Sequence, residues 1–114
     1  MEARAIKKHI RSSPRKMRLV VDLIRGKNAA QALSILRFNT KHAAKDAERV
    51  LKSAIANISN HDDGKNVRAE ELFVKTVFVD AGPMAKRVLP APMGRAYRVR
   101  KRSNHLTIVV ATKD

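Results

Sequence analysis

Basic side chains gather in the stretch from Gly82 to Arg102, which reads GPMAKRVLPAPMGRAYRVRKR. It contains seven Lys or Arg residues and no acidic residue. Lysine and arginine at this density are suited to bind phosphate groups, because neutralising a phosphate releases its counterion. Pro90, Pro92 and Gly94 interrupt any helix or central strand through the segment. The stretch is therefore an extended, coreless candidate for binding a polyanion.

The positive charge is concentrated at the two ends of the chain. The 114 residues carry a net charge of +15, of which residues 1–27 carry +7, residues 28–80 carry +1 and residues 81–114 carry +7. A folded body with two basic segments explains this distribution better than a uniformly basic, disordered chain. At this size such a charge indicates nucleic acid as the partner and, less often, an anionic membrane.

Residues for other kinds of chemistry are missing. The chain has no cysteine, which excludes a disulfide, a thiolate zinc site and a cysteine nucleophile. Its four histidines are dispersed without the spacing of metal ligands. Glu70 and Glu71 are adjacent, so they point in different directions, and no P-loop, dinucleotide fingerprint or nucleophile elbow occurs. We expect no enzyme, no metal and no cofactor.

The sequence also favours a cytoplasmic location. No apolar run approaches the roughly 20 residues that span a bilayer, and residues 1–13 lack the apolar region of a secretory signal. A membrane-surface role is weak, because no predicted helix pairs a lysine-rich face with exposed bulky apolar residues.

The N-terminal third predicts an edge strand followed by two helices. Residues 3–10 loosely alternate between apolar and polar side chains. Ser13 and Pro14 then form a helix start, and Gly26 is expected to end that helix. Asn28 begins a second short helix that ends before Asn39.

A third helix over residues 41–60 is predicted to be the central core helix, with Thr40 as its cap. Its apolar stripe comprises Ala43, Ala47, Val50, Leu51, Ala54, Ile55 and Ile58. Residues 60–66 read as a solvated turn rather than a calcium loop.

Two long extended segments, residues 72–80 and 95–112, must pair with each other. If pairing continues outward over about twelve residues, the tip lies some 40 Å from the body. A two-stranded ribbon of that length has no core and needs a surface to lie against.

Basic residues near the first helix extend the candidate phosphate-binding surface. Arg15, Lys16 and Arg18 occupy the first turn, where the helix dipole prefers acids, which favours an external anion; the alternative is an ordinary solvated basic face. Tyr97 is the only aromatic residue in the basic stretch, so base stacking is not expected. The target should be a folded, backbone-rich nucleic acid.

The segments SSPRKMRLVVDLIRGK, RVLKSAIAN and VDAGPMAKRVLPAPMGRAYRVRKRSNHLTIVV resemble, in order and spacing, the bacterial large-subunit ribosomal protein twenty-two family in its universal form. The match covers almost the whole chain, and the last segment is very specific. The resemblance implies an α+β fold in which three helices pack on a small three-stranded antiparallel sheet, with a long protruding β-hairpin. It implies a single domain over residues 1–114, in which residues 1–80 and 98–114 form the body and residues 81–97 the extended hairpin tip.

The resemblance also implies partners. These are several domains of large-subunit ribosomal RNA, neighbouring large-subunit ribosomal proteins and the nascent peptide. The resemblance further implies that the protein is a monomer within the ribosome, supports subunit assembly and lines the peptide exit tunnel with its hairpin. By composition and resemblance together, the expected ribosomal-RNA contacts are Arg11, Ser13, Arg15, Lys16, Arg18, Lys86, Arg87, Arg95, Arg98, Arg100, Lys101, Arg102, Ser103, Asn104 and His105. The expected exit-tunnel tip comprises Met84, Ala85, Lys86, Arg87, Leu89, Pro90, Ala91, Pro92, Met93 and Gly94.

At its apex the chain departs from the family pattern. Many members carry Arg or Lys between the tip proline and the glycine, whereas this chain has Ala91, Pro92 and Met93. The departure predicts a stiffer and less positive apex. The alternative function is an architectural DNA-binding protein that lays a basic β-ribbon in a minor groove.

Overall fold

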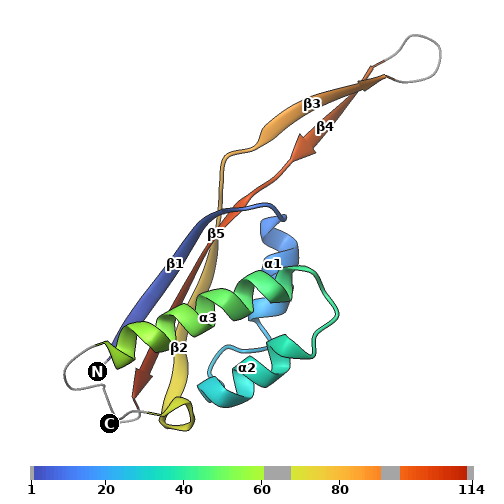
Figure 1. Ribbon diagram of the computed structural model, residues 1–114. Coiled ribbons are helices and arrows are strands. Elements are labelled where there is room, and N and C mark those ends of the chain that lie inside the picture. Colours follow the sequence, from blue (N-terminus) through green and yellow to red (C-terminus); the bar gives the residue numbers. More distant parts are fainter. Residues whose placement is uncertain (1, 61–67, 91–95, 113–114) are drawn as a thin grey trace.

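The computed structural model describes residues 2–60, 68–90 and 96–112, and for residues 85–90 and 96–100 it describes the backbone alone. The element order is β1 (Glu2–Ile10), α1 (Pro14–Val21), α2 (Ala29–Arg37), α3 (Ala43–Ser59), β2 (Leu72–Ala81), β3 (Ala85–Pro90), β4 (Ala96–Lys101) and β5 (Asn104–Thr112). The three helices lie on one face of the sheet β1-β5-β2, and a second pair of strands, β3 and β4, projects beyond the body (Figure 1). The predicted α+β fold with three helices on a three-stranded antiparallel sheet is confirmed.

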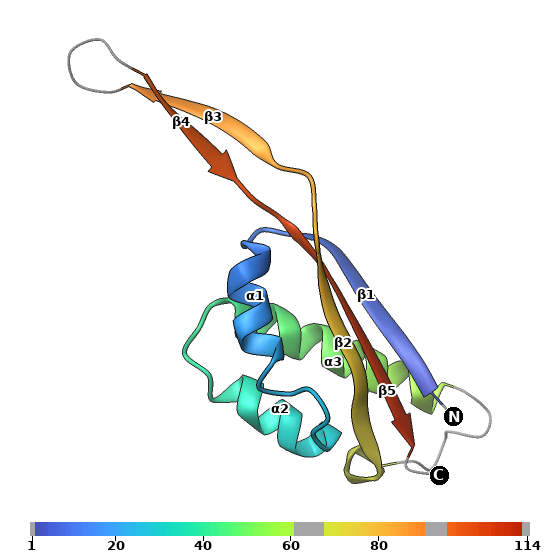
Figure 2. The same ribbon diagram turned by 180° about the vertical axis from the view of Figure 1, so that it is seen from behind.

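The core lies between α3 and the sheet. Alanines along α3 allow a close approach, and Ala44, Ala47 and Ala54 are fully buried there, as is Leu51. Of the predicted stripe, only Ile55 is partly exposed. The view from behind shows the opposite face of the sheet without a covering helix (Figure 2).

Strand β2 changes which of its side chains face the core. Leu72 and Val74 are buried, and the burial then resumes at Val77 and Val79, one residue out of phase. A β-bulge between Val74 and Thr76 inserts the extra residue and explains the shift. The bulge keeps all four apolar side chains in the core.

The first helix ends at Val21, earlier than Gly26 predicts. The chain tightens after Val21, where the N–H of Ile24 donates to the carbonyl oxygen of Val21. Gly26, in the left-handed region at φ 76°, then donates its N–H to the carbonyl oxygen of Val74 at 3.1 Å. The glycine marks the turn onto the free edge of β2, and this contact covers an otherwise exposed strand edge.

The predicted cap of the third helix is wrong. The residue at the cap position of α3 is His42, which makes no side-chain capping bond, and not Thr40. The helix begins instead with backbone hydrogen bonds between residues three apart. The N–H of Ala44 donates to the carbonyl oxygen of Lys41, and the N–H of Lys45 donates to that of His42. The predicted caps of the first two helices are confirmed: Ser13 Oγ accepts from the N–H of Lys16, and Asn28 Oδ1 accepts from the N–H of Ala30.

The extended segments pair as predicted, but not as one continuous ribbon. β2 pairs with β5 and β3 with β4, both antiparallel, and the ladders separate at residues 82–84 and 102–103. The whole chain measures 64 Å along its longest axis. None of the helices in the described ranges has the length and apolarity to cross a membrane.

Candidate nucleic-acid interface

The hairpin joins the body at a tight contact between two chain segments. The N–H of Gly82 donates to the carbonyl oxygen of Ser103 at 2.9 Å, and the hydroxyl of Ser103 donates to the carbonyl oxygen of Pro83 at 2.6 Å. A Cβ atom at Gly82 would lie only 2.6 Å from Ser103 Oγ. Glycine is therefore required for this approach, which fixes where the ribbon leaves the sheet.

Asn104 holds the N-terminal basic segment against the base of the hairpin. Its side chain is fully buried, and its amide nitrogen donates to both the carbonyl oxygen and the hydroxyl oxygen of Ser12, each at 2.8 Å. Its side-chain oxygen has no hydrogen-bond partner among the described residues. Asn104 is buried in the free chain, and the RNA contact expected of it stays a prediction. Its role is to position Ser12, a residue that the sequence did not single out.

The two histidines at this end of the sheet contact each other. The backbone N–H of His9 donates to Nδ1 of His105 at 3.0 Å, and the two rings meet edge to face with centroids 5.0 Å apart. His9 has φ 60° and lies in the bulge between Lys7 and Ile10 of the β1–β5 ladder. Since Nδ1 of His105 accepts here, a neutral His105 ring carries its proton on Nε2. His105 is half-buried, and it tethers β1 to the start of β5.

Two exposed arginines each bind a backbone carbonyl oxygen of β2. The guanidinium of Arg18 donates to the carbonyl oxygen of Val79 at 2.9 Å, and that of Arg25 donates to Val77 at 2.9 Å. Arg25 also pairs with Asp22 at 2.5 Å. Both arginines therefore attach the α1 region to the outer edge of β2. These bonds explain part of the basic character of the α1 region without an external anion. They could not be predicted from the sequence, because the acceptors lie more than 50 residues away.

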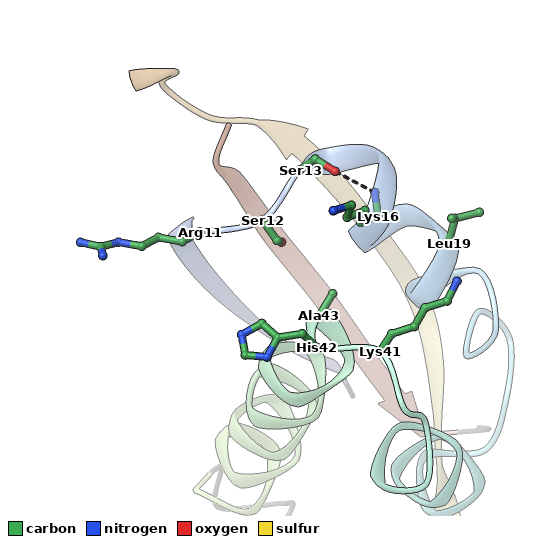
Figure 3. Close-up of a pocket in the computed structure, with 8 residues that line it drawn as sticks. All are labelled: Arg11, Ser12, Ser13, Lys16, Leu19, Lys41, His42 and Ala43. Atoms are coloured by element: carbon green, nitrogen blue, oxygen red, sulfur yellow. Dashed lines mark hydrogen bonds between the residues drawn. The ribbon is translucent and has the colours of Figure 1, made fainter. Parts of the chain in front are cut away.

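A cleft of about 500 Å³ opens beside the start of α1. One wall comes from residues 11–13, Lys16 and Leu19. The other comes from Lys41 and His42 in the connection between α2 and α3 and from Ala43 at the start of α3. Figure 3 shows Lys41 reaching from that connection toward Leu19 on α1. Arg11, Ser13 and Lys16, predicted RNA contacts, all line the cleft, and Figure 3 shows the guanidinium of Arg11 pointing away from the other two.

The second wall of the cleft was not predicted. Lys41 and His42 precede α3, whereas the sequence placed them in the first turn of the third helix, without a binding role. These two residues lie across the cleft from Lys16 because of the way α1 and α3 pack, and no local sequence pattern predicts that packing. An exposed Lys-His pair before a core helix is the only signal that could have drawn attention to them.

The ribbon β3–β4 carries cationic residues at opposed positions. Lys86 is the register partner of Arg100, and Val88 that of Arg98. At its base, Lys101, Arg102 and Met84 are exposed. The apex residues Ala91, Pro92, Met93, Gly94 and Arg95 lie outside the described residues. No group of three or more metal-binding side chains occurs in the described ranges.

These features define a class: a small, basic α+β protein in which a two-stranded ribbon projects from a helix-covered sheet. Residues 5–111 match the family model described as Ribosomal protein L22p/L17e. The chain belongs to this family, and it is accordingly a structural ribosomal protein and not an enzyme. The family resemblance expected from the sequence is confirmed.

Curated relatives match along nearly their whole length. "Large ribosomal subunit protein uL22" of Chlorobaculum tepidum is 58% identical over 110 residues, covering 96% of this chain and 92% of the relative. The protein of the same name from Chlorobium phaeovibrioides is 60% identical with the same coverage. That of Chlorobium phaeobacteroides strain BS1 is 54% identical over 112 residues, covering 98% of this chain and 96% of the relative.

Proposed function

We propose that this chain binds large-subunit ribosomal RNA, supports assembly of the subunit and extends its hairpin into the peptide exit tunnel. The family and the names of the relatives support the large subunit as its location. In bacteria that location is cytoplasmic. The proposed partners are several domains of the RNA, neighbouring large-subunit proteins and the nascent peptide, with one copy of this chain in each particle.

One observation carries the RNA-binding part of the proposal: the two basic ends of the chain meet. Residues 1–27 and residues 81–114 each carry a net charge of +7. The hydrogen bonds from Asn104 to Ser12 join these segments at the base of the hairpin. Arg11, Lys101 and Arg102 are exposed around this junction. The fold thus combines two separate charge clusters into one region, which suits a target with phosphates on several sides.

The ribbon supports the same conclusion. Like charges at directly opposed positions destabilise a strand pair, and a two-stranded ribbon without a core is marginal in water. Lys86 lies opposite Arg100 in the register. A polyanion along the ribbon removes this repulsion and supplies the missing packing surface. We therefore assign the ribbon to a channel lined by RNA.

A deletion separates the body from the ribbon. Removing Met84 to Arg95 should leave the body folded, because the described core residues lie in α1 to α3 and in the sheet β1-β5-β2. The variant should keep most of its affinity for large-subunit RNA through the N-terminal cluster and the base of the ribbon. Loss of the helical circular-dichroism signal would contradict this division. Failure of the unaltered chain to co-sediment with large subunits at moderate salt would overturn the proposed function itself.

A further inference from the structure

The cleft between α1 and the α2–α3 connection has the lining of a phosphate-binding site. Lys16 and Lys41 bring cations to it from the two walls, and Arg11 also lines it, with its guanidinium pointing away from both lysines (Figure 3). No carboxylate lies within ion-pairing distance of these three residues in the part of the chain that the structure describes. The nearest acid in α3, Asp46, already pairs with Lys7 at 3.3 Å. The cleft is therefore positively charged without internal compensation.

The hydroxyl groups of the cleft strengthen its preference for an anion. Ser13 Oγ accepts the N–H of Lys16, and Ser12 Oγ accepts from Asn104, so both hydroxyls act as acceptors toward the protein. Among the described residues, no acceptor takes either hydroxyl hydrogen. Each hydroxyl can therefore donate to a ligand. The lining supplies cations and hydroxyl donors, which suits phosphate oxygens.

The cleft is too large and too apolar for a phosphate alone. Its volume of about 500 Å³ falls within the range of pockets that enclose an organic ligand. Leu19, 53% exposed, lies on one wall, and Ala43 on the other. A nucleotide combines the apolar flat face of a base with a charged phosphate. An apolar wall suits the base, and the cationic wall beside it suits the phosphate.

We propose that this cleft holds a single unpaired nucleotide of the bound RNA. Its phosphate contacts Lys16 and Lys41, and its base lies against Leu19. The inference rests on the proposed function and makes it more specific, because it distinguishes one turned-out nucleotide from contact with duplex backbone. Unpaired nucleotides are the part of folded RNA whose bases proteins can enclose. Asn104 is a positioning residue here, since it holds Ser12 in the wall.

The test uses the full chain, large-subunit RNA and four variants. Lys16→Ala and Lys41→Ala should each weaken binding by about threefold to tenfold and lower the logarithmic salt slope by about 0.7 to 0.9. Leu19→Ser should weaken binding by a similar factor with an unchanged salt slope. Lys45→Ala is the matched control, because Lys45 is exposed one turn further along α3 and does not line the cleft.

Chemical probing of the RNA at single-nucleotide resolution provides the decisive readout. The three cleft variants should all expose the same one or two unpaired nucleotides, which the wild type and Lys45→Ala protect. Identical protection by Lys41→Ala and Lys45→Ala would overturn the inference, as would exposure of duplex backbone alone or a changed contact with a neighbouring protein alone. Those results leave wild-type RNA binding intact, so they are distinct from failure of the proposed function.

Discussion

The hydroxyl of Ser103 and the carbonyl oxygen of Pro83 lie 2.6 Å apart, bonded across the two strands at the point where the hairpin leaves the body. The N–H of Gly82 donates to the carbonyl oxygen of the same serine at 2.9 Å. The ribbon therefore emerges from a junction with little free space, and its direction is set by one serine, one proline and one glycine.

Substitution of Gly82 by alanine tests this junction. The added methyl would meet Ser103 Oγ at 2.6 Å and His105 Cε1 at 3.2 Å, so Ser103 must turn away and lose its bond to Pro83. We expect Gly82→Ala to lower the free energy of unfolding by about 1 to 2 kcal/mol. In a Ser103→Ala background the same substitution should cost less, because the closest contact has been removed. Equal costs in the two backgrounds, measured by urea unfolding, would contradict the account.

Asn104 should contribute to stability through its two bonds to Ser12. Asn104→Ala leaves the polar groups of Ser12 without their partner in a partly buried place. We expect a loss of about 1 to 3 kcal/mol in the free energy of unfolding. Ser12→Ala, which removes only the hydroxyl, should cost less. A stability loss within error of zero for Asn104→Ala would show that the amide does not fasten the N-terminal segment.

Substitution of Arg18 and of Arg15 should distinguish an arginine that stabilises the fold from one that binds RNA. Both side chains are exposed on α1, but of the two it is Arg18 that donates to a backbone carbonyl oxygen, that of Val79. Arg18→Ala should lower the free energy of unfolding by about 1 kcal/mol with little change in the salt slope of RNA binding. Arg15→Ala should do the reverse, leaving stability unchanged and lowering the slope by about 0.7 to 0.9. The opposite assignment of the two effects would show that Arg18 is free for RNA.

The carboxyl of Glu2 provides a pH test. A hydrogen bond from Lys75, helped by its charge, holds the pKa of Glu2 below its ordinary value of 4.5. The depressed pKa means that the stabilisation is present above 4.5 and is lost as the pH falls through the lower, folded-state pKa. Lys75→Ala should raise the pKa of Glu2, as followed by NMR titration of its carboxyl carbon. An unchanged pKa would exclude the 2.6 Å pair as its cause.

Elements whose determinants are local could be predicted from the sequence. Ser13 and Pro14 start α1 because a cap and a proline act on adjacent residues. The alanine-rich stripe placed α3 on the sheet because its period depends only on the helix itself. The pairing of the two extended segments was predicted from their length, and β1, which is as long as β5, pairs with β5 on its other side.

Features that depend on distant contacts could not be predicted. The early end of α1 depends on the contact between Gly26 and Val74, and the break in the ribbon on the contact between Gly82 and Ser103. Asn104 matched the family motif as an RNA contact, yet packing buries it against Ser12. The cleft forms only where the segments of Lys16 and Lys41 lie side by side, and no pattern in the sequence predicts that these two segments are neighbours.

Cross-linking from Lys86 in isolated large subunits tests the central claim most directly. Lys86 lies in β3, within the ribbon that projects from the body (Figure 1). A cross-linker on its side chain should join it to ribosomal RNA in the wall of the exit tunnel and, in translating ribosomes, to the nascent peptide. Lys52, exposed on α3, is the control and should give neither product. Products from Lys86 confined to the outer surface of the subunit would contradict the account.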